Sequence, residues 1–408
     1  MFINIFYLSL VQITNYVFPL ITLPYLVRVL GVSQFGGVML AQTVIQYCII
    51  ITDYGFNLSA TKKITLANGK DNINSIYTST FYARLLLSFL CLCAILILIY
   101  CFGLFYEQRD IILVMFIGVI GNCLFPIYLF QGLELMRNIA WISICSKTLM
   151  TILTFLLVRN SGDIINAAIV LMLPLLVPGV IAHFYIKKEK IATMNKVDIS
   201  SVFNELKESS PLFISQVSIS FYTTFNTLIL GYFYSPTMVG LYSAADKLRV
   251  AVQSCYIPIQ QVIFPKMNKE NGTVGHKLFK YGGPFLIVSF CGSILVFVFG
   301  QKLATMYLGE DFSSSAILFK WMSILLFVIA VAIVFGQWGL ITLGKEKTLT
   351  KIYVTGAFLH LCYTIPLVEK YSIFGMLTSV IITELVITFI MIIFFYIELR
   401  KIKSYLKQ

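Results

Sequence analysis

Long apolar runs alternate along this chain with short segments rich in Lys, Arg, Gly, Pro, Asn and Ser. Runs such as 85–100 and 285–299 lack the apolar-polar alternation of membrane barrel strands, so they predict helices, which satisfy their own backbone hydrogen bonds in lipid. A span needs about 20 apolar residues. The runs predict about twelve spans, near 5–30, 37–57, 77–103, 111–133, 139–158, 164–186, 211–234, 238–265, 278–300, 315–343, 350–368 and 373–397.

Composition supports a membrane protein, since 59% of the 408 residues are apolar and 12% are charged. These values exclude water-soluble enzyme folds and predict an all-α polytopic membrane protein. Residues 187–210 carry five lysines and four acidic residues and form the longest polar stretch between predicted spans. We therefore predict a cytoplasmic linker at 187–210 between an N-terminal six-helix lobe, 1–186, and a C-terminal six-helix lobe, 211–408, which ends in a basic cytoplasmic tail.

The basic residues predict the orientation of the spans. Twenty of the 30 Lys and Arg residues fall in the even-numbered loops and the C-terminal tail, and five fall in the odd-numbered loops. Because cytoplasmic loops carry an excess of Lys and Arg, both termini and the even loops are expected in the cytoplasm. The net charge of +12 then reflects topology, and no nucleic-acid partner is expected.

Two helix hairpins carry a similar pattern, one in each predicted lobe. Gly36 precedes Ala41 by five positions, and Gly240 precedes Ala245 by the same spacing. This weak repeat of six spans predicts two copies with the same orientation in the membrane. Prolines inside spans, such as Pro126 and Pro258, predict kinked helices.

The sequence contains none of the common catalytic motifs, such as a Walker loop, H-E-x-x-H or G-x-S-x-G. Its nine cysteines lie in or beside apolar runs with no C-x-x-C pair, and we interpret them as small buried hydrophobic residues. Neither an enzyme nor a cofactor nor a metal site is therefore predicted.

Charged residues within or at the ends of spans are the candidate functional residues, because each costs about 3 kcal/mol in hydrocarbon. Most are cations, as an anion-binding path would need: Arg28, Arg84, Lys147, Lys247, Arg249 and Lys320. The titratable candidates for gating or ion coupling are Asp53, Asp246, His360 and Glu384, with a proton or a sodium ion as the coupling ion. Snorkelling to the interface is the alternative for the groups near span ends: Arg28, Lys320 and Asp53.

Asp246 has two candidate partners. It lies three residues before Arg249, so the two can form a local ion pair on one face of a helix. The alternative is a pairing of Asp246 with Arg28 across the two halves when the periplasmic side is closed.

Several segments together resemble the bacterial polysaccharide flippases of the O-antigen flippase family. They are Pro19–Gly31, Asp53–Phe56, Pro126–Met136 and Val239–Lys247, in both halves of the chain. The resemblance implies the fold of the multidrug/oligosaccharidyl-lipid/polysaccharide exporter superfamily, with two six-helix lobes around a central cationic cavity.

The resemblance also implies a function in the bacterial inner membrane. The substrate would be an oligosaccharide repeat unit on undecaprenyl diphosphate, moved from the cytoplasmic to the periplasmic leaflet by alternating access. The cations named above would contact the diphosphate, and Gln42, Gln131, Asn226 and Gln260 would bind sugar hydroxyls or hydrogen-bond between helices. Membrane lipids, a polysaccharide polymerase and a chain-length regulator are the implied partners.

Each alternative function would require sequence features of its own. A multidrug exporter of the same superfamily would offer acidic and aromatic residues to cationic drugs, and a lipid II flippase would carry further C-terminal spans. A membrane polysaccharide polymerase, the enzyme alternative, would need a large periplasmic loop or a catalytic domain.

Overall fold

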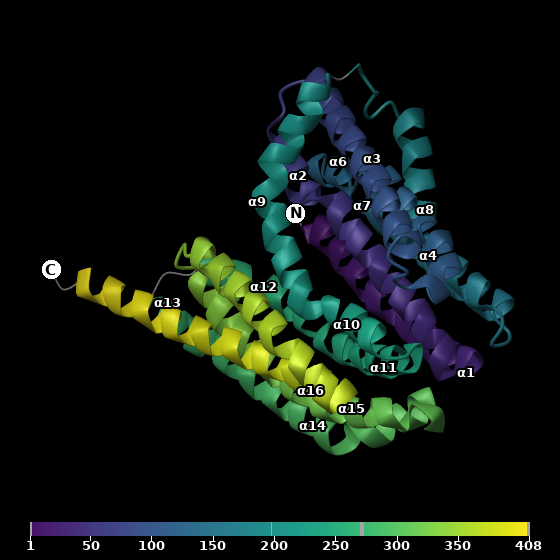
Figure 1. Ribbon diagram of the computed structural model, residues 1–408. Helices are drawn as coiled ribbons and strands as arrows, with labels where there is room; N and C mark the ends of the chain where they lie inside the picture. Colours follow the sequence, from purple (N-terminus) through teal and green to yellow (C-terminus); the bar gives the residue numbers. More distant parts are fainter. Residues whose placement is uncertain (1, 197, 270–272, 406–408) are drawn as a thin grey trace. The chain divides into compact units, whose positions relative to one another are not determined.

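The computed structural model describes residues 2–196, 198–269 and 273–405, and over these residues the chain is α-helical with no strand (Figure 1). It divides into two compact units. Unit 1 contains Met1–Val217 and Ser235–Gly240, and unit 2 contains Ser218–Tyr234 and Leu241–Gln408. The chain thus passes between the units three times, at 217–218, 234–235 and 240–241.

Unit 1 is built around a long first helix. Its helices are α1 (Phe2–Asp53), α2 (Phe56–Leu66), α3 (Lys70–Tyr100), the 3-10 turn η1 (Tyr106–Gln108), α4 (Arg109–Met115), α5 (Ile117–Leu124), α6 (Ile127–Gly132), α7 (Met136–Leu157), α8 (Ile164–Lys188) and most of α9 (Ile199–Thr223). Helix α1 packs against α7, α7 against α8, and α8 against α5, while α2 packs against α6.

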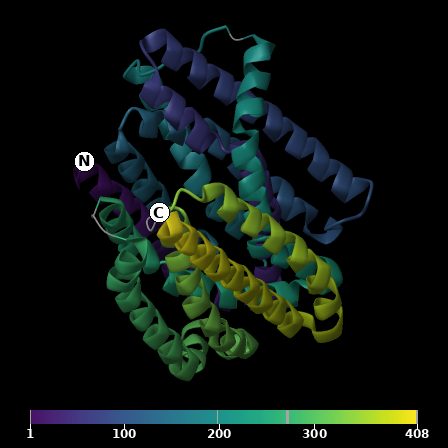
Figure 2. The same cartoon turned by 90° about the vertical axis from the view of Figure 1, so that its left-hand side faces the viewer.

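Unit 2 follows a similar plan. Its helices are α10 (Phe225–Phe233), α11 (Pro236–Gln253), α12 (Tyr256–Lys269), α13 (Val274–Lys277), the π-helical η2 (Leu278–Gly282), α14 (Gly283–Leu308), the 3-10 turn η3 (Glu310–Phe312), α15 (Ser313–Ala332), the π-helical η4 (Ile333–Leu340) and α16 (Glu346–Tyr405). Helix α14 packs against α15, and α15 against α16. In Figure 2 the two arms of α16, at the yellow end of the colour scale, lie antiparallel and side by side.

The structure confirms an all-α polytopic membrane protein. In the described residues eight helical segments are long and apolar enough to cross a membrane. The first, Leu10–Leu66, and the last, Glu346–Lys401, have 57 and 56 residues, more than twice the roughly 20 that one crossing needs. The seventh and eighth predicted spans are helical as α9 to α12 but are not among the eight segments, so the count of twelve stays a prediction.

Both overlong helices are hairpins folded at one residue. Helix α1 turns at Gly31, whose φ of 71° lies in the left-handed region that glycine adopts at no steric cost. Helix α16 turns at Ser372, with a φ of 54°. The two turns fall between predicted spans 5–30 and 37–57 and between 350–368 and 373–397, so the sequence predicted the position of both turns.

Two of the predicted proline kinks are full helix breaks. Pro126 separates α5 from α6, and α11 ends at Gln253, shortly before Pro258 in the first turn of α12. A proline offers no N–H to the preceding turn, so the helix ends before it. By contrast, Pro19 and Pro24 lie inside the continuous first arm of α1.

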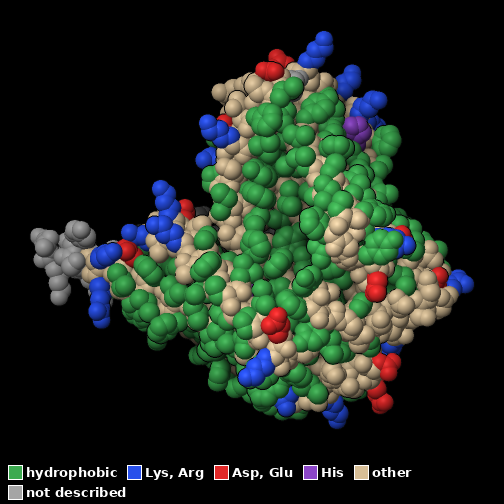
Figure 3. All heavy atoms as spheres, in the orientation of Figure 1, with side chains coloured by type: hydrophobic (Ala, Val, Ile, Leu, Met, Phe, Trp, Pro, Cys, Tyr) green, Lys and Arg blue, Asp and Glu red, His purple; other side chains and the backbone are tan. Residues whose placement is uncertain are grey.

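Apolar side chains cover much of the face seen in Figure 3, with charged side chains in small groups among and around them. This surface corrects the expectation that all cysteines are buried, since Cys101, Cys145, Cys255, Cys291 and Cys362 are exposed. In a membrane an exposed helix face meets lipid, so a small apolar residue gains little from a place in the core.

The repeated glycines of the two hairpins pack against each other within unit 1. A Cβ on Gly36 would lie 1.7 Å from the carbonyl oxygen of Pro236 and 2.8 Å from the backbone nitrogen of Gly240. A Cβ on Gly240 would lie 2.4 Å from the carbonyl oxygen of Val32. The first turn of α11 therefore rests backbone to backbone on α1, and both positions require glycine.

This close approach predicts that one of two adjacent substitutions destabilises the protein and that the other does not. Gly36→Ala forces the backbones apart and should destabilise the protein by about 1–3 kcal/mol, the usual cost of overpacking. Gly37→Ala is the matched control, because its new Cβ would meet only the Gln108 side chain at 3.9 Å. Thermal unfolding in detergent should show a lower midpoint for Gly36→Ala alone, and equal midpoints would contradict the packing.

Candidate functional site

A buried ion pair lies at the centre of unit 1. Arg84 of α3 is 1% exposed, and its Nη2 lies 2.5 Å from Oδ1 of Asp53, the last residue of α1. The same carboxylate oxygen accepts a hydrogen bond from Nδ2 of Asn122 at 3.0 Å. Sequence analysis placed Arg84 among the substrate contacts, whereas here its charge is used within the protein. A direct substrate contact by Arg84 stays a prediction that requires this pair to open.

The ion pair sits where two helices are interrupted. Helix α1 ends at Asp53 and α2 begins at Phe56, and α5 ends at Leu124 just before Pro126. Arg84 Nη1 donates to the carbonyl oxygen of Phe125 at 3.1 Å, at the second break. Since an interrupted helix leaves backbone carbonyls without helical partners in an apolar medium, Arg84 stabilises one break while Asp53 neutralises its charge.

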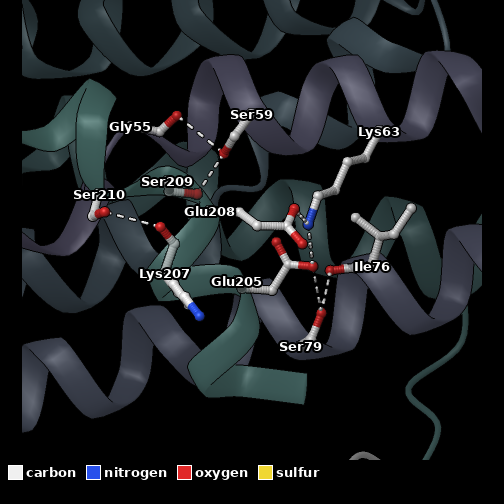
Figure 4. A network of polar contacts seen from close by, with 10 residues as sticks. All are labelled: Gly55, Ser59, Lys63, Ile76, Ser79, Glu205, Lys207, Glu208, Ser209 and Ser210. Carbon is white, nitrogen blue, oxygen red and sulfur yellow. Dashed lines mark hydrogen bonds and ion pairs between the residues drawn. The ribbon is translucent and has the colours of Figure 1, made fainter. Parts of the chain in front are cut away.

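The segment predicted as a linker is tied to α2 and α3 by polar contacts (Figure 4). Residues 199–210 form the first half of α9, so the segment is partly helical. Lys63 of α2 forms ion pairs with Glu205 at 2.9 Å and Glu208 at 2.7 Å, and the hydroxyls of Ser59 and Ser209 are 2.7 Å apart. These contacts hold the first half of α9 in unit 1.

The other candidates of unit 1 are dispersed. Lys147 of α7 is half-buried and donates to Oδ1 of Asn15 on α1. Arg28 is exposed on α1, and Gln42 is half-buried on the second arm of that helix. Gln131 of α6 faces Thr61 of α2, whose hydroxyl donates to Oε1 at 3.5 Å, so it takes part in a helix–helix contact.

Unit 2 brings three of the charged candidates together on α11. Arg249 Nη2 lies 2.7 Å from Oδ1 of Asp246, which is the local ion pair considered above, and its Nη1 donates to Gln253. Lys247 is half-buried on the same helix. The pairing of Asp246 with Arg28 stays a prediction.

Glu384 lies on the second arm of α16 and is half-buried. Arg249 is near enough to interact electrostatically with it, as are the hydroxyls of Tyr222, Tyr353 and Tyr363. In the described part of the chain no hydrogen bond or ion pair reaches the Glu384 carboxylate, which therefore has acceptor capacity for a ligand or a proton.

His360 is the centre of a hydrogen-bond network inside unit 2. The ring is buried, with Nδ1 2.6 Å from Thr383 Oγ1 and Nε2 2.8 Å from Asn226 Oδ1. Tyr363 also bonds to the Thr383 hydroxyl. Sequence analysis identified His360 and Asn226 separately and missed Thr383 and Tyr363. The signal available for Tyr363 was its position three residues after His360 on a helix.

Two candidates of unit 2 lie apart from these groups. Lys320 of α15 lies over the ring of Phe297, 5.0 Å from its centroid, in a cation–π contact. Gln260 is half-buried on α12. Among the described residues no group of three or more His, Cys, Asp or Glu side chains could hold a metal ion.

Comparison with known sequences finds one family over most of the chain. A family model described as "Polysaccharide biosynthesis protein" matches residues 2–271. A Shigella dysenteriae protein named "Putative O-antigen transporter" is 36% identical over 393 residues, covering 95% of this chain and 98% of the relative. An Escherichia coli K12 protein of the same name is 30% identical, covering 96% and 95%.

Solved structures share the fold. A multidrug resistance MATE family transporter of the MOP superfamily, in an inward-facing conformation, matches with a TM-score of 0.76 at 14% identity, over 98% of this chain and 99% of the transporter. The lipid II flippase MurJ matches with a TM-score of 0.76 at 11% identity, over 96% and 87%. These likenesses confirm the exporter fold that the sequence motifs implied.

The Arg84–Asp53 pair predicts a coupled stability effect. Arg84→Met leaves a largely buried carboxylate without its cation and should destabilise the protein by about 3–5 kcal/mol, whereas Arg84→Met with Asp53→Asn should recover much of that loss. Arg109→Met is the matched control, because its ion pair with Asp110 is on the surface. Thermal unfolding of the four proteins tests this, and no recovery in the double variant would contradict the pairing.

Proposed function

Because this chain belongs to the polysaccharide biosynthesis protein family, we propose that it is a flippase for a lipid-linked oligosaccharide repeat unit. The observation that carries the proposal is the match over almost the whole chain to relatives named as O-antigen transporters. Relatives and structural neighbours are transporters, so the chain is a transporter and not an enzyme. Its place is the bacterial inner membrane, with both termini in the cytoplasm.

The proposed substrate is the repeat unit on undecaprenyl diphosphate, which would cross from the cytoplasmic to the periplasmic leaflet by alternating access. A diphosphate needs cations along its path, because its charge costs free energy in hydrocarbon. Support comes from Lys147 and Arg249, which are half-buried and retain donor groups beyond their described partners. Arg28, Lys247 and Lys320 are further proposed contacts, and Gln42 and Gln260 are proposed to bind sugar hydroxyls.

The proposed energy source is an ion gradient, since the sequence contains no nucleotide-binding motif. Glu384 and His360 are the titratable candidates whose described contacts leave them outside any ion pair, and the Glu384 carboxylate lies near Arg249. Asp246 is committed to Arg249, and Asp53 to Arg84, so each would have to exchange partners to take part. A polysaccharide polymerase and a chain-length regulator are proposed partners in the same membrane.

Deletion of the gene should leave the complete lipid-linked repeat unit on the cytoplasmic leaflet, measured by leaflet-specific labelling of the radiolabelled glycan. The wild-type chain should restore transfer, and Arg249→Gln and Lys147→Gln should reduce its rate tenfold or more at equal expression. Lys302→Gln, on the exposed face of α14, is the matched control and should restore transfer fully. A complete unit that reaches the periplasmic leaflet in the deletion strain would instead indicate a polymerase.

Glu384→Gln should slow gradient-driven transfer by tenfold or more while the affinity for lipid-linked glycan changes less than twofold, because the amide keeps the shape and loses the charge. Glu369→Gln, an exposed position on the same helix, is the control. Binding of glycan to purified protein and transfer in vesicles separate the two effects. Loss of binding with normal expression would contradict a coupling role.

A further inference from the structure

We infer that His360 is the site that binds the coupling proton, and that Asn226 and Thr383 hold its ring so that one nitrogen, Nδ1, gains and loses that proton. This inference rests on the proposed function and assigns the coupling ion and its residue. The His360 side chain is buried in unit 2, and oxygen atoms from other helical segments contact both of its nitrogens.

Asn226 determines which ring nitrogen of His360 carries a hydrogen in both protonation states of the ring. Its Nδ2 donates to the carbonyl oxygens of Tyr222 at 3.1 Å and Thr223 at 3.4 Å, so its Oδ1 must be the atom that faces the ring. That oxygen only accepts hydrogen bonds. Nε2 of His360, 2.8 Å away, is therefore the donor in every protonation state.

The hydroxyl of Thr383 can either donate a hydrogen bond to Nδ1 of His360 or accept one from it. Its Oγ1 lies 2.6 Å from Nδ1 of His360 and 2.7 Å from the carbonyl oxygen of Ser379. With a neutral ring the Thr383 hydroxyl donates to Nδ1. When Nδ1 binds a proton it becomes the donor, and the hydroxyl rotates to donate to the Ser379 carbonyl oxygen. Both states are fully hydrogen-bonded, so proton binding breaks the network in neither of them.

The network extends toward acidic residues on both sides. Tyr363 bonds to the Thr383 hydroxyl and interacts electrostatically with Glu384. Tyr242 of α11 lies close to Asn226 and interacts electrostatically with Asp246. The titratable and charged groups near the residues of this network, on the helices that pack around it, are Tyr222, Tyr242, Asp246, Arg249, Tyr363 and Glu384. Because Nε2 keeps its hydrogen toward Asn226, the relay lies on the other side, where the hydroxyls of Thr383 and Tyr363 lead from Nδ1 toward Glu384.

A metal cation fits this site poorly. A histidine binds a metal through a ring nitrogen that carries no hydrogen, and Nδ1 is the one nitrogen in that state. It is already bonded to Thr383, and its surroundings supply no carboxylate in direct contact. The geometry therefore favours a proton over a sodium ion.

The first test is the tautomer of His360. The chain has three histidines, His183, His276 and His360, so nitrogen NMR of histidine-labelled protein gives three pairs of ring-nitrogen signals, and His360→Gln identifies the relevant pair. The neutral ring should carry its hydrogen on Nε2. A hydrogen on Nδ1 instead would overturn the assigned network whether or not the protein is a flippase.

The second test is transfer in vesicles that contain the purified full-length chain and lipid-linked glycan extracted from the deletion strain. An imposed pH gradient should accelerate net transfer by the wild type at least tenfold. His360→Gln and Thr383→Val should lose this acceleration while exchange at equal pH stays within twofold. Thr383→Ser, which keeps the hydroxyl, and His183→Gln, an exposed histidine on α8, should retain it.

The outcomes separate the two proposals. Acceleration retained in His360→Gln, or a response of the wild type to a sodium gradient alone, would overturn the proton site and leave the flippase intact. A wild-type chain that moves no lipid-linked glycan under any condition would overturn the proposed function itself. Exchange at equal pH lost along with the acceleration would indicate a structural role for the network.

Discussion

The free-energy cost of charge and of unpaired polar groups in hydrocarbon is the constraint on which both units depend. It explains why the spans are helices, and why Arg84 is held by both a carboxylate and a backbone carbonyl. The helix break at Pro126 is tolerable in an apolar medium because Arg84 donates to the carbonyl oxygen beside it. The break in turn places Asn122 where it can bond to Asp53. One buried charge thus organises α1, α3, α5 and α6.

Hydrophobic patterning predicted most of the fold because span length and loop polarity are properties of the sequence alone. The turns at Gly31 and Ser372 fall between predicted spans, and Pro126 breaks a helix as expected. Patterning said less about polar segments. The first half of α9 was expected to belong to a linker, because its glutamates give no apolar run, and its contacts with Lys63 and Ser59 of α2 were not predicted. That outcome depends on a tertiary partner that no local pattern contains.

The candidate site was less predictable, since a charge inside a span can serve structure or function and its partner decides which. Sequence analysis listed Arg84 and Asp53 in different roles, although together they form one ion pair. Asp246 and Arg249 were recognisable as a pair because helical geometry places i and i+3 side by side. His360 bonds to Asn226, which is 134 positions away along the chain, and to Thr383, which is 23 positions away. Only the folded structure could show that these residues meet.

The two units differ in the kind of polar group that they bury. In unit 1 the buried guanidinium of Arg84 and the carboxylate of Asp53 neutralise each other. This arrangement opposes a change of protonation, because neutralising one group would leave the other as an unpaired buried charge. In unit 2 the network near His360 is neutral, and the hydroxyl of Thr383 can satisfy either state of the ring. A site that cycles must have two states of similar free energy, since a ligand shifts an equilibrium only by its differential affinity. On that criterion the ion pair of unit 1 is suited to a fixed scaffold, and the network of unit 2 is the element that we propose responds to a proton.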